Sequence, residues 1–316
     1  MTSGLDIGTM FGAGGVDTFL GLPPCLDVTG FDAKIAVIGA PGATPYPSVG
    51  AYCATAPTAI RAAMAGYAAN LHHMDFDLGG EIFPDGLISA VDCGDIPYDE
   101  TNPRANRKRI RDTICHILDR DGTPLVFGGD DSIPTPVIQA FEGRGDLTIL
   151  QIDAHIDWRD EVDGVQMGLS STMRRVSETP HIAGIVQVGA RAIGSARPND
   201  YQDALDWGVK FITARQVHET GLAQVLDHIP AGGQVYIALD VDALDPSLVP
   251  GVIGPAPGGL TYWQVAGLIS AVAGKARIAG ASLVEYLPER DVNDIGALTT
   301  ARIGVNIIGH LARQTA

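Results

Sequence analysis

Two short acidic motifs are the residues of this chain best placed to do chemistry. In the first, Asp153, His155 and Asp157 alternate with apolar residues, and in an extended segment this spacing directs all three side chains to one side. In the second motif, Asp240 and Asp242 repeat the alternation. Carboxylates gathered in this way repel one another and lose hydration unless a cation lies among them. The motifs therefore predict a divalent metal site, in which oxygen ligands with some imidazole favour manganese, iron, nickel or cobalt.

A third acidic motif, Gly128-Gly129-Asp130-Asp131-Ser132, is weaker by itself. Two glycines before an acidic pair also suit a tight turn into a helix. A single Asp-X-Asp at the end of a strand is often only a turn and a helix cap. Two such motifs, one with an interposed histidine and each directly after an apolar run, favour metal binding over a purely structural role.

Short apolar runs bounded by glycine, proline or aspartate predict the strands that position these motifs. They lie at residues 35–40, 87–92, 124–129, 147–153, 184–190, 209–213, 234–240 and 276–286. The runs are nearly continuous rather than alternating, which is typical of strands covered on both faces. Helical patterns lie between them: they begin at Ala56, at Pro103 and at Thr261, which we expect to cap its helix, and another covers about 292–311.

Strand and helix alternating about eight times predict an α/β fold with a parallel sheet, either closed as a barrel or open with helices on both faces. In both architectures the working residues lie at the carboxyl ends of the strands. The sequence contains no Ser/Gly-rich linker and no repeat, so we expect a single domain over residues 1–316. Residues 1–33 are expected to form an N-terminal extension that packs at a subunit contact.

Composition excludes several classes of partner. The chain has 21 Lys and Arg against 37 Asp and Glu, a net charge of −16, which argues against binding to nucleic acid or to an anionic membrane. It has no apolar run of about 18 residues and no basic start with an apolar block, so we expect a cytoplasmic protein. The cysteines show no metal-binding spacing and are expected to be buried as small hydrophobes: Cys25, Cys53, Cys93 and Cys115.

Taken together, the three acidic motifs resemble those of the ureohydrolase family, which includes arginase, agmatinase and related amidinohydrolases. The resemblance covers most of the chain and includes residues 91–96, 187–191, 239–261 and 283–285. It implies a three-layer α/β/α sandwich with an open parallel sheet of about eight strands, which decides against the barrel. It also implies two divalent metal ions, usually manganese, and a homo-oligomer that is often a trimer or a hexamer.

The resemblance also implies a role for each site residue. Asp153 and Asp240 would bridge the two metals, while His155 and Asp242 would bind one metal and Asp157 the other. Glu285 matches the acidic residue that receives a guanidinium group. The implied reaction is the attack of a hydroxide, generated between the metals and oriented by Asp157, on the central carbon of a guanidine. An amine leaves, and urea or a substituted urea remains.

The sequence departs from the family at three places. Asp131 stands where the family usually has a histidine; we expect it still to bind metal, as a fifth carboxylate that brings the ligand charge to −5 instead of −4. The added charge should raise the pKa of the bridging water, which makes nickel an alternative to manganese and predicts an alkaline pH optimum. Leu169 lies at or near the position of a second family histidine, and the loops at 39–46 and 250–256 are less polar.

We therefore expect a binuclear metal-dependent amidinohydrolase that acts on a linear guanidine compound and is closer to agmatinase than to arginase. A small or alkylated guanidine, a guanidino acid or a biguanide would suit the less polar loops. The alternative is a catalytically degenerate subunit that supports an active paralogue in a hetero-oligomer, as the replaced histidines suggest. A deacetylase of related fold with a single zinc ion is more distant, because the second acidic motif argues against it.

Overall fold

The computed structural model describes residues 16–84 and 86–315, and its strands form one parallel sheet in the order β2-β1-β3-β8-β7-β4-β5-β6. The strands are β1 (Ile35–Ala40), β2 (Ala90–Asp95), β3 (Thr123–Gly128), β4 (Leu147–Ile152), β5 (Ile182–Val188), β6 (Lys210–Ile212), β7 (Gln234–Asp240) and β8 (Arg277–Val284). Strands β1, β3, β4 and β7 are almost completely buried, as their continuous apolar sequences predict.

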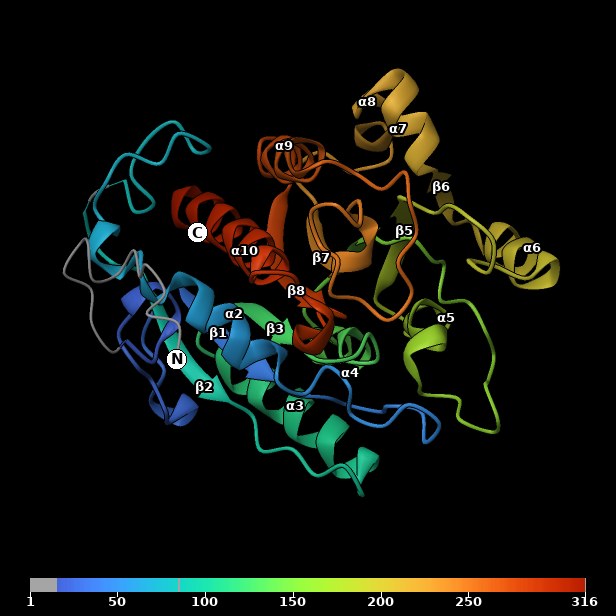
Figure 1. Ribbon diagram of the computed structural model, residues 1–316, viewed down its shortest axis with the longest axis horizontal. Helices are drawn as coiled ribbons and strands as arrows, with labels where there is room; N and C mark the ends of the chain where they lie inside the picture. Colours follow the sequence, from blue (N-terminus) through green and yellow to red (C-terminus); the bar gives the residue numbers. More distant parts are fainter. Residues whose placement is uncertain (1–15, 85, 316) are drawn as a thin grey trace.

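Helices cover both faces of the sheet. One layer holds α2 (Ala56–Ala65), α7 (Ala214–Thr220), α8 (Ala223–Leu226), α9 (Tyr262–Ala273) and α10 (Ile295–Arg313), whose apolar residues share one core with the sheet. The other layer holds α3 (Pro103–Leu118), α4 (Pro134–Gln139), α5 (Thr172–Ser177) and α6 (Pro198–Trp207), which pack in a second core. Figure 1 shows β1 and β3 running between α10 and α3. The predicted three-layer α/β/α sandwich with an open parallel sheet is confirmed.

Short 3-10 helices lie in the connections. They are η1 (Phe19–Gly21), η2 (Val28–Gly30), η3 (Ala68–Asn70), η4 (Leu169–Ser171), η5 (Val241–Ala243) and η6 (Pro288–Arg290). The predicted cap of α9 is confirmed: Thr261 accepts a hydrogen bond from the backbone N–H of Gln264, whose side chain bonds back to the N–H of Thr261.

Some predicted boundaries were wrong. The strand predicted at 87–92 begins at Ala90, because the side chains of Leu87 and Ile88 are 76% and 37% exposed and so contribute nothing to the core. The helix that begins at Ala56, as predicted, ends at Ala65, and a turn at Gly66 follows. The last helix begins at Ile295 rather than near 292.

The cysteines are all free, but only Cys53 is buried. The prediction of burial was wrong for Cys25, Cys93 and Cys115, which are half-buried. Cys93 lies on β2 at the edge of the sheet, where the short segment at residues 23–25 bonds to the backbone of Asp92 on the outer side of the strand.

Within the predicted N-terminal extension, residues 1–15 lie outside the described residues. Phe19, Leu20 and Leu22 pack in the same core as α2 and α10. Contact of this extension with another subunit stays a prediction. No helix in the described part of the chain is long and apolar enough to cross a membrane.

Candidate metal centre and substrate pocket

The order of the central strands brings the acidic motifs together. Strands β3, β8, β7 and β4 are neighbours, and their carboxyl ends lie at the same edge of the sheet. Asp131 follows β3, Glu285 follows β8, Asp240 ends β7 and Asp153 follows β4. In an open parallel sheet this edge is where ligands bind.

Tight turns after β4 and β7 direct the second acidic or imidazole side chain of each motif back over the strand ends. The backbone N–H of His155 donates to Asp153 Oδ1 at 2.6 Å. In the same way the N–H of Asp242, in η5, donates to Asp240 Oδ1 at 2.7 Å. The alternation seen in the sequence therefore continues as a turn that uses the first carboxylate as its cap.

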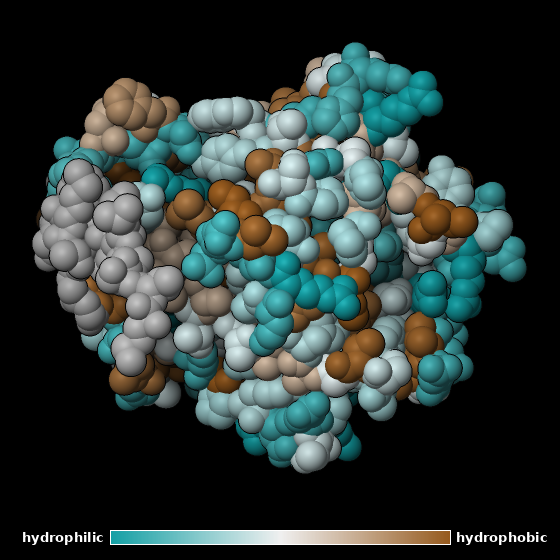
Figure 2. Space-filling model, viewed as in Figure 1, coloured by the Kyte–Doolittle hydropathy of each residue, from teal (hydrophilic) through white to brown (hydrophobic). Residues whose placement is uncertain are grey.

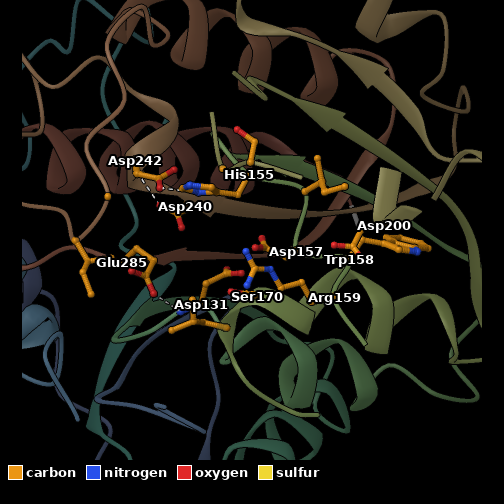
Figure 3. A pocket seen from close by; sticks show the side chains of 16 residues that line it. Asp131, His155, Asp157, Trp158, Arg159, Ser170, Asp200, Asp240, Asp242 and Glu285 are labelled. Carbon is orange, nitrogen blue, oxygen red and sulfur yellow. Dashed lines mark hydrogen bonds and ion pairs between the residues drawn. The ribbon is translucent and has the colours of Figure 1, made fainter. Parts of the chain in front are cut away.

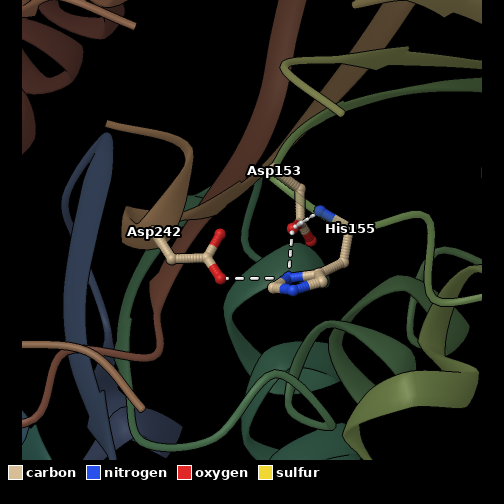
Figure 4. Close-up of side chains that lie close together, drawn as sticks. All are labelled: Asp153, His155 and Asp242. Atoms are coloured by element: carbon tan, nitrogen blue, oxygen red, sulfur yellow. Dashed lines mark hydrogen bonds and ion pairs between the residues drawn. The ribbon is translucent and has the colours of Figure 1, made fainter. Parts of the chain in front are cut away.

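Two groups of side chains have ligand atoms close enough to hold a metal ion. In each group these atoms lie within 4.8 Å of one another: Asp153, His155 and Asp242 form one group, and Asp131, Asp153 and Asp240 form the other. His155 Nδ1 lies 3.0 Å from Asp242 Oδ2 and 3.5 Å from Asp153 Oδ1 (Figure 4). Asp153 belongs to both groups, whereas Asp240, predicted to bridge as well, belongs to one. The assignment of metal ligands stays a prediction.

Burying the carboxylates of this cluster together costs free energy unless a cation neutralises them. Its carboxylates are at most 8% exposed: Asp131, Asp153, Asp157, Asp240 and Asp242. Burial, and then repulsion between neighbouring carboxylates, raises the pKa of Asp131, Asp157 and Asp240 well above its ordinary value. Asp131 Oδ2 is a buried atom for which the described residues provide no hydrogen-bond partner. The donor set therefore fits divalent cations, which would supply the missing charge and occupy this oxygen.

His155 and Asp153 behave differently from the other members of the cluster. Burial alone would lower the pKa of His155, but hydrogen bonds to Asp153 and Asp242 outweigh burial and raise this pKa to about 11. Burial alone would raise the pKa of Asp153, but the hydrogen bonds and charge of His155, together with a hydrogen bond to Asp157, outweigh burial and lower this pKa. An imidazole must lose its second proton to bind a metal, so metal binding at this position releases protons.

A pair of glutamines holds two of the acidic side chains. Gln151 Nε2 donates to Asp153 Oδ2 and to Asp157 Oδ2, at 2.7 Å each. Gln187 Nε2 donates to Gln151 Oε1 and, at 2.8 Å, to the carbonyl oxygen of Ile156. The two glutamines are register partners on β4 and β5. This network of hydrogen bonds fixes the orientation of the Asp153 and Asp157 carboxylates.

Glu285 is held rigidly at the other side of the cluster. Both of its carboxylate oxygens lie 2.7 Å from the hydroxyl of Tyr52, and the backbone N–H of Asp131 donates to Oε1 at 2.8 Å. Burial raises the pKa of Glu285 to about 8, against the opposing hydrogen bonds from Tyr52 and Asp131. Its backbone lies in the left-handed region, with φ of 68°. Such strained positions of non-glycine residues gather at functional sites.

A pocket opens above the cluster (Figure 3). Its polar and charged lining is Asp131, His155, Asp157, Arg159, Ser170, Ser195, Asp200, Asp240, Asp242 and Glu285. Its apolar lining is Ile156, Trp158, Leu169 and Ile253. Leu169, which the resemblance places at or near the position of a family histidine, thus lines the pocket. Ile253 lies in one of the loops that the sequence marks as less polar.

The structure adds residues that sequence reasoning missed. The sequence pattern could have pointed to Gln151, because this residue continues the alternation of Asp153 and Asp157 toward the strand. Arg159 follows the same motif by two residues, and it lines the pocket. No sequence pattern pointed to Tyr52, since it lies in the turns between β1 and α2. Its hydrogen bond to Glu285 forms only because the fold brings these distant segments together.

Comparison with known proteins identifies the family. Residues 33–312 match the model of the Arginase family. The chain is 34% identical to N(1)-aminopropylagmatine ureohydrolase from Thermus thermophilus over 217 residues, 68% of this chain and 71% of that protein. The structure superimposes on a hypothetical agmatinase from Burkholderia thailandensis with a TM-score of 0.80, 26% identity and coverage of 95% of this chain and 91% of that chain.

A second solved structure, formimidoylglutamase from Bacillus subtilis, gives a TM-score of 0.79 at 25% identity, with coverage of 94% of this chain and 92% of that chain. The chain belongs to the arginase family. It is a hydrolase of amidino carbon–nitrogen bonds. The relatives act on different compounds, so the family leaves the substrate open.

Proposed function

We propose that this protein is a binuclear amidinohydrolase that converts a linear guanidine into urea, or a urea derivative, and an amine. The observation that carries the proposal is the pair of ligand groups that share Asp153, with Glu285 in the same pocket. A shared carboxylate suits two adjacent cations, whereas a single zinc ion, as in a deacetylase, would need only one group. The proposed ligands are Asp131, Asp153, His155, Asp157, Asp240 and Asp242.

The protein's own residues would bind and orient the reactants. Glu285, buried and fixed by Tyr52, accepts hydrogen bonds from the guanidinium and holds its central carbon over the cluster. Asp157 accepts a hydrogen bond from the attacking water and can carry its proton toward the leaving amine. The bound metal ions would supply the attacking hydroxide by lowering the pKa of a bound water. The apolar wall of Trp158, Leu169 and Ile253 limits access of bulk water.

The test is a guanidine panel assayed with defined metals. Chelated protein is reloaded with manganese or nickel, and release of urea and amine is measured for agmatine, alkylguanidines, guanidino acids and biguanides. We expect at least one compound to be hydrolysed. Glu285→Gln should lower kcat/KM at least 100-fold, because the guanidinium loses its charged partner. The exposed Glu289→Gln is the matched control and should retain activity.

The second candidate is a catalytically degenerate subunit that supports an active paralogue. Leu169 in the pocket favours it, since this side chain carries no proton for the leaving amine. In that case purified protein would release no urea with either metal, and activity would appear only when a paralogous chain is added. A homo-oligomer, trimer or hexamer, that hydrolyses a guanidine without a second chain would exclude this candidate; light scattering measures its size.

A further inference from the structure

Cys25 and Cys93 lie opposite each other where the N-terminal segment runs along the edge strand β2. The N–H of Asp92 donates to the carbonyl oxygen of Pro23 at 2.9 Å, and the N–H of Cys25 donates to the carbonyl oxygen of Asp92 at 2.8 Å. These two hydrogen bonds make Pro24 the parallel partner of Asp92. The next pair in the same register is Cys25 and Cys93, which are separated in the sequence by the whole of β1 and α2.

The side chains of this pair share one face of the sheet. Both cysteines pack against the core that α3 forms with the sheet. The register also continues past them: a Cβ placed on Gly94 would lie 3.3 Å from Cδ2 of Leu26, the residue after Cys25. The Cys25 thiol is close enough to act on Cys93, because burial first and the Cys25 thiol next raise the pKa of Cys93 to about 12.

This geometry suits a covalent bond between the two sulfurs. Directly paired residues of neighbouring strands lie about 5 Å apart between their Cα atoms. A disulfide spans about 4.4 to 6.8 Å between Cα atoms, so Cys25 and Cys93 need no rearrangement of the backbone to form one. Both thiols are free and only half-buried, which leaves them within reach of a small reagent.

We propose that Cys25 and Cys93 form a redox modification site, which a small-molecule disulfide converts reversibly into a Cys25–Cys93 disulfide. The Cys25 thiolate attacks one sulfur of the reagent, so that a mixed disulfide forms and one thiolate leaves. Cys93 then gives up its proton and attacks the Cys25 sulfur, and the second thiolate leaves. Two protein thiols are oxidised, and the reagent is reduced to two thiols. The reaction begins at Cys25 because the raised pKa keeps Cys93 protonated.

The bond would lock the N-terminal segment onto the edge of the sheet. In the reduced chain this segment is held next to the cysteines by Asp92, whose Oδ2 accepts from the N–H of Phe19 at 2.7 Å and from Nε of Arg61 at 2.8 Å. A disulfide one residue further along makes this attachment covalent and keeps the edge strand covered. The inference goes beyond the proposed function and does not depend on the reaction at the acidic cluster.

The experiment treats the reduced full chain, loaded with manganese, with oxidised glutathione in the absence of air. Free thiols, counted in denaturant, should fall from four to two. Mass spectrometry of unreduced peptides should find residues 25 and 93 cross-linked, with a mass lower by two hydrogens. The melting temperature should rise by roughly 5 °C, because the bond closes a long loop and restricts the unfolded chain. Dithiothreitol should reverse all three changes.

Single substitutions separate this pair from the other thiols. Cys93→Ser should stop after the first step, with a glutathione adduct on Cys25 and no rise in melting temperature. Cys25→Ser should form no cross-link either. The matched control is Cys115→Ser, since Cys115 is also half-buried but its thiol lies 3.9 Å from the carbonyl oxygen of Ala140; this variant should lose two thiols and gain the same stability as wild type.

Each melting temperature is compared with that of the reduced form of the same variant, so that a less stable variant still reports the shift. Four free thiols in treated wild type would overturn the proposal. So would glutathione adducts on both Cys25 and Cys93 without a cross-link, or a cross-link that joins two chains. An equal rise in melting temperature in Cys93→Ser would show that another group causes the effect, and it would overturn the proposal as well.

Discussion

Asp131 gives the candidate centre a carboxylate where the resemblance leads one to expect an imidazole. Its ligand atoms belong to the group with Asp153 and Asp240, and its Oδ2 is buried with no donor from the described residues. Three carboxylates in one group attract a cation strongly but leave it with a lower effective charge. A cation with a lower effective charge polarises a bound water less, so the pKa of that water is higher.

Asp131→His should therefore move the acidic limb of the pH profile of kcat/KM downward, by roughly one pH unit. The profile is measured with manganese and with nickel, and metal content is determined by mass spectrometry. Asp131→Asn is the matched variant, because it removes the charge without adding an imidazole, and it should lose metal from this position. Superimposable profiles for wild type and Asp131→His would contradict the electrostatic argument.

At the scale of elements, the neighbouring strands β4 and β5 hold two carboxylates of the candidate centre in place through their glutamine side chains. Gln151 and Gln187 are register partners, so the hydrogen bond between their side chains ties the two strands directly beneath the acidic motif. One amide group donates to two carboxylates, which positions them for the same side of a cation. Groups that orient metal ligands typically change metal affinity 10- to 100-fold when they are removed.

Gln151→Leu should weaken metal binding by about that factor, because Asp153 and Asp157 lose their shared donor and repel each other freely. Competition with a fluorescent chelator measures the affinity without reference to activity. Gln187→Leu keeps both hydrogen bonds to the carboxylates and removes the hydrogen bonds of Gln187 to Gln151 and to the carbonyl oxygen of Ile156, so its effect should be smaller. An unchanged affinity in Gln151→Leu would mean that the network is structural only.

Elements also explain how much the sequence could predict. The apolar runs predicted each strand, and β7 at 234–240 to the residue, because burial on both faces leaves a direct mark on composition. The alternation at their ends predicted which carboxylates converge. Contacts between distant segments leave no such mark: Tyr52 bonds to Glu285 across 233 residues of sequence, and only the packed fold joins them. The sequence did not distinguish Arg159 from other charged residues, and only the fold places it in the lining of the pocket.

The whole molecule carries its acid surplus in two places. Much of it lies on a surface where hydrophilic and hydrophobic side chains are interspersed (Figure 2). The rest is the cluster at the sheet edge, whose carboxylates and Glu285 are buried. Surface carboxylates keep their hydration, whereas the buried ones lose it on folding. The stability of the metal-free protein should therefore depend on pH through the cluster rather than through the net charge.

The sign of this dependence follows from the shifted groups. The pKa of Glu285 rises to about 8 from an ordinary 4.5, so between these values the folded chain holds a proton that the unfolded chain has released. Stability then falls as pH rises through this range. His155 acts in the same direction: its contribution is complete below 6.5 and is lost as pH approaches about 11. Asp131, Asp157 and Asp240, whose pKa values are also raised, add to the fall.

The melting temperature of chelated protein should therefore fall by several degrees between pH 5 and pH 8. Manganese or nickel should reverse the trend, because metal binding needs deprotonated ligands and stabilises the folded chain more at higher pH. Calorimetry at matched ionic strength measures both series. Glu285→Gln should flatten the metal-free slope, since the amide does not titrate, while Glu289→Gln on the surface should leave it unchanged. A melting temperature that rises with pH in the chelated protein would contradict this argument, because the buried carboxylates would then favour their charged form in the folded chain.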